Sequence, residues 1–214
     1  NWAWAVYSPA IFPPKRGPNL LLQPAPERER RASDKLAAIA IEDLAMKLVL
    51  VRHAIAEEAD AFIAAGGSDA QRPLTEIGRK KMRKGANRLR ALVGRIDLLA
   101  HSPLLRARET ADIIARACGD PPQMECADLD YRYPPEAVAD WLAQYPRDAL
   151  VVTVGHEPQL SLLTGLLLVG EPLSLIAFRK GGVAMIEFPN RAEAGKGLLH
   201  WALTPGQLRS LKQD

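Results

Sequence analysis

The sequence has little cysteine and no long apolar run, and each absence excludes a class of protein. Its two cysteines, Cys118 and Cys126, lie in neither a Cys-x-x-Cys nor a Cys-plus-His spacing, so we expect ordinary thiols without a metal or redox role. The most apolar helical candidate, 160–169, is much shorter than the roughly 18 to 20 residues of a membrane span. A secretory signal pattern is also missing. We therefore expect no membrane partner and a cytoplasmic location.

Charge of one sign is scarce as well. The net charge is +3, and basic and acidic residues alternate without forming a basic tract, so we expect no nucleic-acid partner. A few arginines aimed at one phosphate-binding pocket account for the small excess equally well. With 214 residues, 48% of them hydrophobic, the chain has enough apolar side chains for one packed domain.

The chain divides into two parts by composition. Six prolines punctuate the beginning: Pro9, Pro13, Pro14, Pro18, Pro24 and Pro26. Proline removes backbone donors and prevents regular structure, so we expect residues 1–45 to be a disordered or loosely attached extension, with a short helix at 33–44. Residues 46–214 are the predicted domain.

Strands and helices alternate in this domain. Apolar runs predict strands at 47–51, 96–100, 149–154, 173–178, 183–187 and 198–202. Helical periodicity predicts helices at 75–93, 103–118, 135–144 and 158–168, the first of them capped by Thr75. The alternation predicts a three-layer α/β/α sandwich with a mostly parallel central sheet, to which the last two strands add an antiparallel hairpin.

Polar residues follow three of the predicted strands. Arg52 and His53 end the first, His101 the second and His156 the valine-rich strand. Because ligands bind at the carboxyl ends of strands in open α/β sheets, we expect these residues to converge. Arg106, in the first turn of the helix after His101, points back over the same edge.

These side chains suit phosphoryl transfer, which needs an in-line atom and fixed positive charge around the phosphoryl oxygens. A neutral imidazole, with an ordinary pKa of about 6.5, makes His53 a nucleophile. Arg52 and Arg106 hold phosphate oxygens through paired hydrogen bonds. We expect His156 to be protonated opposite a phosphate dianion and to donate as well. Packing alone does not explain the cluster, because buried cations without anions are costly.

Three motifs resemble the histidine phosphatase superfamily, also called the phosphoglycerate mutase-like family. Residues 50–54, Leu-Val-Arg-His-Ala, resemble its Arg-His-Gly signature. Residues 101–111 resemble its Ser-Pro-x-x-Arg-Ala-x-x-Thr-Ala block, and 154–156 its second histidine. The motifs occur in the family's order, and the resemblance covers about residues 46–203.

The resemblance implies a phosphoglycerate mutase-like fold and a role for each site residue. His53 is implied as the phosphorylated nucleophile, with Arg52, Arg106 and His156 as the phosphate pocket. Arg72, before a block that resembles Pro-Leu-Thr-x-x-Gly, is implied as a substrate contact; the alternative is a surface arginine before a helix cap.

Two features depart from the family pattern. Ala54 replaces the usual glycine, which is the smallest change available beside His53. Larger members also place an acid between the second helix and the next strand. Here that segment offers Glu125, Asp128 and Asp130 without the family's usual surroundings, so we assign no general acid and expect each to be a solvated loop charge.

The short segment at 117–149 favours a protein substrate, because it is too small to build a lid over a metabolite. A phosphorus–nitrogen bond breaks without the strong proton donation that an alkoxide needs. The chain thus resembles the small bacterial phosphohistidine phosphatases that act on histidine-containing phosphotransfer domains, and we expect no cofactor or metal. Two alternatives stay open: a small-molecule phosphomonoesterase of the same family, and a non-catalytic phosphate- or phosphopeptide-binding module. A mutase needs an enclosed, dry pocket and is disfavoured.

Overall fold

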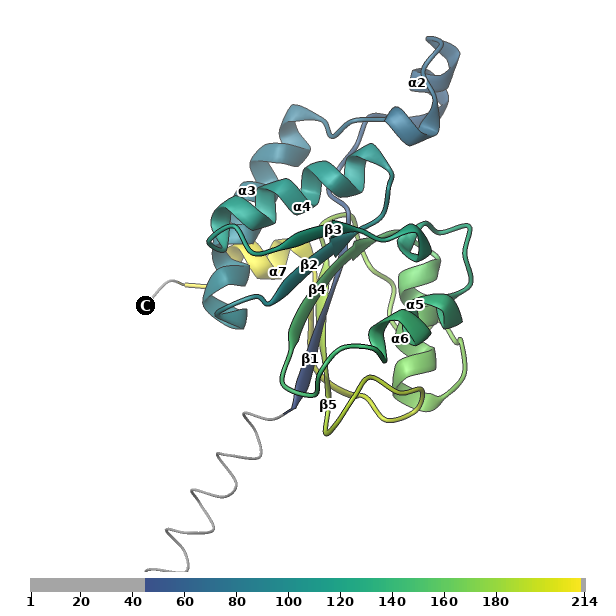
Figure 1. Ribbon diagram of the computed structural model, residues 1–214. Helices are drawn as coiled ribbons and strands as arrows, with labels where there is room; N and C mark the ends of the chain where they lie inside the picture. The colour runs from purple at the N-terminus through teal and green to yellow at the C-terminus, as the bar shows by residue number, and fades with distance from the viewer. Residues whose placement is uncertain (1–44, 213–214) are drawn as a thin grey trace, which may run out of the picture. The chain divides into compact units, whose positions relative to one another are not determined.

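The computed structural model describes residues 45–212, and the predicted helix at 33–44 and the extension up to residue 44 lie outside them. A six-stranded sheet in the order β3-β2-β4-β1-β5-β6 forms the centre of the described part (Figure 1). Its strands are β1 (Met46–Arg52), β2 (Leu98–His101), β3 (Gln123–Glu125), β4 (Leu150–Gly155), β5 (Val183–Phe188) and β6 (Leu198–Leu203). The first four in spatial order are parallel, whereas β5 and β6 are antiparallel additions. The predicted mixed sheet is confirmed.

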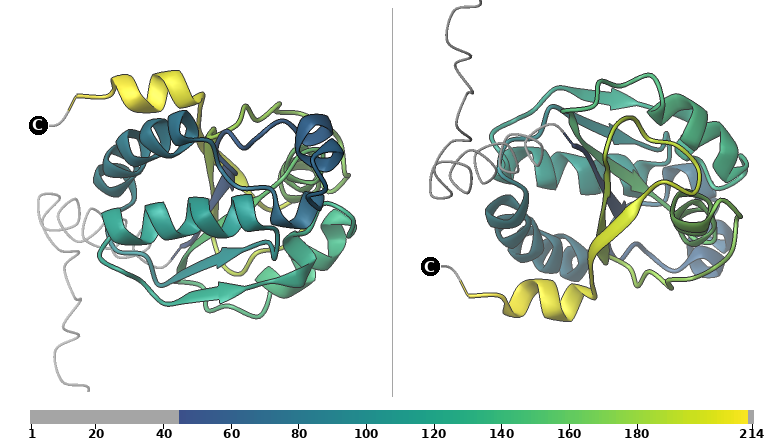
Figure 2. Two further views of the ribbon diagram at one scale, coloured as in Figure 1. Left: turned by 90° about the horizontal axis from the view of Figure 1, so that it is seen from above. Right: turned by 90° about the horizontal axis from the view of Figure 1, so that it is seen from below.

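Helices cover both faces of this sheet, as the two views of Figure 2 show. They are α2 (Ala59–Ala64), α3 (Glu76–Val93), α4 (Leu105–Ala117), α5 (Pro135–Leu142), α6 (Gln159–Val169) and α7 (Pro205–Ser210), with the short 3-10 helices η1 (Asp69–Gln71) and η2 (Ala127–Leu129). The α3, α4 and α7 helices pack on one face, and α5 and α6 on the other. The predicted three-layer α/β/α sandwich is confirmed.

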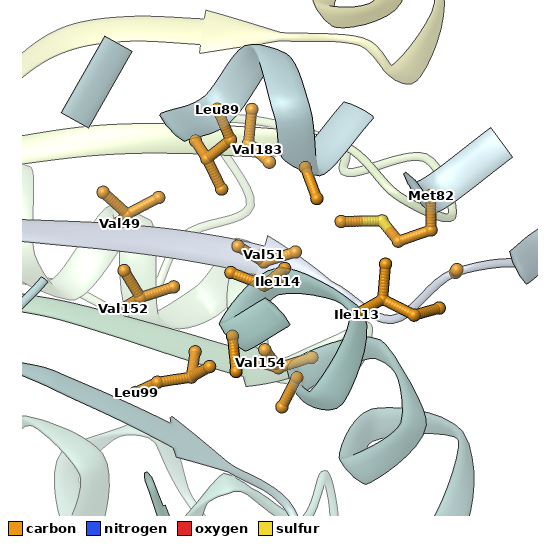
Figure 3. Packing of buried hydrophobic residues seen from close by; sticks show 14 of the residues in the cluster. Val49, Val51, Met82, Leu89, Leu99, Ile113, Ile114, Val152, Val154 and Val183 are labelled. Atoms are coloured by element: carbon orange, nitrogen blue, oxygen red, sulfur yellow. The ribbon is translucent and has the colours of Figure 1, made fainter. Parts of the chain in front are cut away.

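Side chains alternate between the two cores along each central strand. Val49 and Val51 of β1 lie in the core beneath α3 and α4, together with Val152 and Val154 of β4 (Figure 3). Leu48 and the other intervening residues of β1 lie in the opposite core. All of these side chains are fully buried, and each such burial stabilises the fold by about 1.5–3 kcal/mol. This double burial fixes the register of the strands whose ends carry the candidate site.

The first turn of α3 packs directly on the segment that follows β1. Thr75 caps the helix by accepting a hydrogen bond from the Gly78 N–H at 2.9 Å, as predicted. A Cβ atom at Gly78 would lie 2.0 Å from the Ile55 carbonyl oxygen. Glycine at this position therefore permits the close approach that holds the chain just after His53.

The predicted strand at 173–178 is wrong. Its backbone pairs with side chains: the Phe178 N–H donates to Glu157 Oε1 at 2.7 Å, and the Ile176 carbonyl accepts from Ser161 Oγ at 2.6 Å. β1 already has β4 and β5 as neighbours, so the sheet has no vacant position beside it. Leu173 and Leu175 are exposed, and only Ile176 and Phe178 of this segment pack into the core.

Besides the 3-10 helices η1 and η2, three short elements were not predicted. β3 has only three residues, all of them in the exposed range, so it has no apolar pattern. α2 has no buried residue. α7 begins with a capping box between Thr204 and Gln207. The spacing of these two residues is a helix-start signal that is visible in the sequence.

Candidate functional site

The sheet register brings three strand ends to one level. Arg52 of β1 pairs with Gly155 of β4, and His101 of β2 pairs with Val154. The residues that follow these strands are therefore neighbours in space, as predicted. The His53 and His156 rings lie with their centroids 5.0 Å apart.

His53 is held with one ring nitrogen free. The side chain is buried, and its Nδ1 lies 2.7 Å from the Ala54 carbonyl oxygen. Because that oxygen only accepts, Nδ1 carries the proton and Nε2 keeps its lone pair. The backbone is anchored on both sides of Cα: the His53 N–H donates to Gly155 O at 3.0 Å, and the Ala54 N–H donates to Thr110 Oγ1 at 3.0 Å.

His156 is fixed by Ser102, a residue that the sequence reasoning did not assign to the site. His156 Nε2 lies 2.8 Å from Ser102 Oγ, and both side chains are buried. Burial, followed by the positive charges of Arg106 and Arg52, lowers the pKa of His156 to about 3. The imidazole is therefore neutral here, and its protonation opposite a phosphate dianion stays a prediction. A neutral ring that accepts from the Ser102 hydroxyl through Nε2 carries its proton on Nδ1.

Two arginines flank the histidines. Arg52 donates from Nη1 to the Phe178 carbonyl at 2.5 Å. Arg106 is 3% exposed and donates from Nη1 and Nη2 to the backbone and carboxylate oxygens of Asp69, at 2.9 and 3.1 Å. Fixed guanidinium groups of this kind are donors that cannot be deprotonated in proteins.

Three buried nitrogens around the histidines have no hydrogen-bond partner among residues 45–212: Arg52 Nε, Arg106 Nε and His156 Nδ1. Buried donors are almost always paired, and an unpaired one costs free energy. The site therefore contains unpaired N–H donors near the Nε2 lone pair of His53. Such a set of donors is suited to binding an anion with several oxygen atoms.

The electrostatics keep His53 neutral. Burial is the largest influence and lowers the pKa of His53 well below its usual value; repulsion by His156, were it protonated, and by the charges of Arg106 and Arg52 lowers it further. The hydrogen bond to Ala54 opposes this shift only partly. A neutral, oriented imidazole surrounded by positive charge is the state that attacks an electrophilic phosphorus atom.

Arg72 lies beside this cluster and is not a surface residue, since its side chain is 11% exposed. Its Nε donates to Asp69 Oδ1 at 2.9 Å, and its Nη1 donates to the Glu57 carbonyl at 2.7 Å. Asp69 thus connects Arg72 to Arg106. No pattern in the sequence singles out Asp69.

The three acid candidates have different surroundings. Asp130 is buried, contrary to the expected solvated charge, and forms an ion pair with Arg132. The hydrogen bond from Arg132 lowers the pKa of Asp130, which keeps this carboxyl ionised. Glu125 is exposed at the end of β3, and Asp128 is half-buried in η2.

Two further residues hold backbone segments next to the site in place. Glu157 accepts from the Phe178 N–H through one oxygen, while the Phe178 carbonyl accepts from Arg52. Gln159 holds the segment 128–133 by donating to the carbonyls of Asp128, Asp130 and Tyr133.

The segment 128–133 includes the exposed Tyr131, whose ring packs edge-on against His156 with centroids 5.7 Å apart. Among residues 45–212, no group of three or more histidine, cysteine or acidic side chains is arranged to hold a metal ion. No helix in this range is long and apolar enough to cross a membrane.

Fold and site together define an α/β protein that gathers two histidines and two arginines at the carboxyl ends of parallel strands. Residues 48–130 match the histidine phosphatase superfamily (branch 1). The chain belongs to this superfamily and is a phosphatase.

Individual relatives agree with this assignment. An uncharacterised protein of Picosynechococcus is 32% identical over 140 residues, which are 64% of this chain and 82% of that protein. The phosphohistidine phosphatase SixA of Escherichia coli is 27% identical over 176 residues, 78% of this chain and 99% of SixA. A structure of the protein histidine phosphatase SixA complexed with tungstate has a TM-score of 0.66 at 26% identity, and the match covers 76% of this chain and 99% of that one.

Proposed function

We propose that this phosphatase removes phosphate from phosphohistidine on a protein, with His53 as the nucleophile. The observation that carries the proposal is the set of three unpaired buried donors around His53: Arg52 Nε, Arg106 Nε and His156 Nδ1. They correspond in number to the equatorial oxygens of a transferring phosphoryl group. The histidine phosphatase family and the SixA relatives support the same assignment.

The reaction has two steps. In the first, the Nε2 lone pair of His53 attacks phosphorus, the bond from phosphorus to the substrate nitrogen breaks, and its electron pair stays on the substrate imidazole. In the second, water attacks phosphorus, the bond to Nε2 breaks, and phosphate leaves while the water proton passes to solvent. Arg52, Arg106 and His156 hold the oxygens in both steps, so His53 ends neutral as it began.

The absence of a poised acid supports a nitrogen leaving group. Among residues 45–212, both site carboxyls with a shifted pKa, Asp69 and Asp130, have it lowered by arginine partners. Burial alone would raise the pKa of Asp69, but the hydrogen bonds and charges of Arg72 and Arg106 outweigh it. Ionised carboxylates do not protonate an alkoxide, whereas an imidazole that already carries a proton on its other nitrogen leaves neutral.

The site's rim supports a substrate presented on a protein. Tyr131 and Tyr133 are 39% and 47% exposed, and Gln159 fixes the backbone that carries them. Exposed, rigid tyrosines beside a binding cluster are typical of protein contact surfaces. A histidine-containing phosphotransfer domain is the proposed type of partner, and Arg72 is the proposed contact to its phosphoryl group.

A single-turnover experiment tests the proposal. The protein and its His53→Ala variant are mixed with a labelled phosphohistidine protein and, in parallel, with a panel of phosphomonoesters. We expect an acid-labile, alkali-stable adduct on the unchanged protein and none on His53→Ala. The matched control is His200→Ala, which removes a histidine of β6 that lies 3.0 Å from Glu187 of β5 and should keep the adduct.

The outcomes separate the alternatives. Strong preference for the phosphohistidine protein supports the proposal. Faster transfer from a small ester would instead identify a small-molecule phosphomonoesterase. An adduct that also forms on His53→Ala would contradict the role of His53, and no transfer from any substrate would leave a phosphate-binding module.

A further inference from the structure

One carboxylate joins two arginines at the edge of the site. Asp69, the first residue of η1, accepts from Arg106 Nη2 through Oδ2 at 3.1 Å and from Arg72 Nε through Oδ1 at 2.9 Å. Its backbone carbonyl also accepts from Arg106 Nη1 at 2.9 Å. Each guanidinium therefore has its own oxygen of the same carboxylate.

This contact determines which edge of Arg106 is free. One proton of Nη1 and one of Nη2 are engaged by Asp69, whereas Nε has no partner among residues 45–212. A guanidinium has five N–H groups in a fixed fork, and the Nε proton and the second Nη2 proton lie side by side on one free edge. We propose that Asp69 is a positioning residue that turns this edge of Arg106 toward the phosphoryl group and holds Arg72 beside it. The inference rests on the proposed phosphate site at His53.

The segment that carries Asp69 is itself anchored. Arg72 Nη1 donates to the Glu57 carbonyl at 2.7 Å, and the Leu74 N–H donates to Glu109 Oε2 on α4 at 2.7 Å. Asp69 is thus fixed relative to the helix that carries Arg106.

Two opposing effects decide whether Asp69 strengthens or weakens phosphate binding. A carboxylate near the site repels a phosphate dianion, so removing its charge alone would tighten phosphate binding. Against this, Asp69 is already neutralised by Arg72 and Arg106 at hydrogen-bond distance, which weakens its field at the site. An arginine that loses its partner regains rotamer freedom, which binding must then remove. We expect the loss of preorganisation to dominate.

Charge repulsion and preorganisation predict opposite changes in phosphate affinity when Asp69 is replaced, so a binding measurement distinguishes them. Isothermal titration calorimetry measures the Kd for inorganic phosphate and for tungstate with the full chain and with Asp69→Asn, which keeps the size of the side chain and removes its charge. We expect roughly tenfold weaker binding in Asp69→Asn. The matched control is Asp60→Asn on the adjoining helix α2, an exposed residue, which removes the same charge from the same segment and should leave Kd unchanged. Tighter or unchanged binding in Asp69→Asn would show that Asp69 competes with the anion or is irrelevant to it.

A second measurement excludes a merely structural effect. The Nε–H signal of Arg106 in a ¹H–¹⁵N NMR spectrum, assigned with Arg106→Lys, reports whether the guanidinium is held. We expect a single slowly exchanging signal in the unchanged protein and a broadened one in Asp69→Asn, with the backbone amide signals of β1 and β4 in place. A sharp, unshifted Arg106 signal in Asp69→Asn would overturn the proposal. Both measurements use inorganic anions or no ligand, so they remain decisive if the protein proves inactive on phosphohistidine.

Discussion

The rings of His53 and His156 lie with their centroids 5.0 Å apart and an interplanar angle of 51°. Both are buried within reach of Arg52 and Arg106, and the pKa of each histidine is lowered, primarily by burial. The pair is therefore kept neutral by the fold. Neutrality suits His53 as a nucleophile, but it makes the folded state sensitive to acid.

The first prediction follows from this pair. In the unfolded chain a histidine has a pKa of about 6.5, whereas the folded value is about 3 for His156 and well below the usual value for His53. Below pH 6.5 the unfolded state binds more protons, so the free energy of unfolding falls as pH falls. Each histidine contributes up to about 1.4 kcal/mol per pH unit. Urea unfolding between pH 7.5 and about 5 measures this slope.

A variant isolates the contribution of one ring. His156→Gln should reduce the slope of unfolding free energy against pH by up to about 1.4 kcal/mol per pH unit. His200→Gln, which replaces a partly exposed histidine, is the control. An identical slope in the unchanged protein and in His156→Gln would show that His156 is not held neutral.

The second prediction concerns the Ser102 hydroxyl, which lies 2.8 Å from His156 Nε2. Ser102→Ala removes the donor that keeps the His156 proton on Nδ1, so fewer molecules carry the tautomer that donates to a phosphoryl oxygen. We expect kcat/KM to fall about tenfold or more, as for the loss of one oriented catalytic hydrogen bond. Steady-state kinetics measure it. Ser210→Ala on α7, where the hydroxyl contacts only Gln207 O among residues 45–212, should leave kcat/KM unchanged.

The third prediction concerns Thr110, which accepts from the Ala54 N–H and donates to the Arg106 carbonyl. Thr110→Val keeps the shape and leaves the buried Ala54 N–H unpaired, so we expect a loss of about 1–3 kcal/mol in the free energy of unfolding together with lower kcat. Urea unfolding and kinetics measure the two effects.

Thr164 provides the matched comparison for that variant. It is equally buried on α6, and within the described part of the chain its hydroxyl donates only to Leu160 O of its own helix. Thr164→Val should cost less stability and leave kcat unchanged. Equal effects of the two variants would mean that Thr110 has no special link to His53.

The fourth prediction is that activity does not depend on a divalent metal. The arginines and His156 supply the positive charge and donors that magnesium supplies elsewhere, so a chelator should leave kcat/KM unchanged. The measurement compares activity after dialysis against EDTA with activity after magnesium is restored. A strict magnesium requirement would count heavily against the proposed site.

Local signals in the sequence predicted much of the fold because they act over a few residues. Thr75 followed by an amphipathic stretch predicts the capped start of α3, and the burial of β1 and β4 on both faces follows from unbroken apolar runs. Such signals fail where an element is short and exposed, as in β3. They also fail where side chains take over backbone hydrogen bonds, as Glu157 does at Phe178.

The amino-acid sequence by itself determined which residues stand at the strand ends, because strand pattern and strand termini are local properties. The sequence therefore predicts that Arg52, His53 and His156 lie together there, and that Arg106 in the first turn of α4 lies over the same edge. Only the tertiary structure decided that Ser102 orients His156, that Thr110 ties Ala54 to α4 and that Asp69 joins two arginines. These contacts connect segments far apart in the chain, and their partners are chosen by the packing of helices on the sheet.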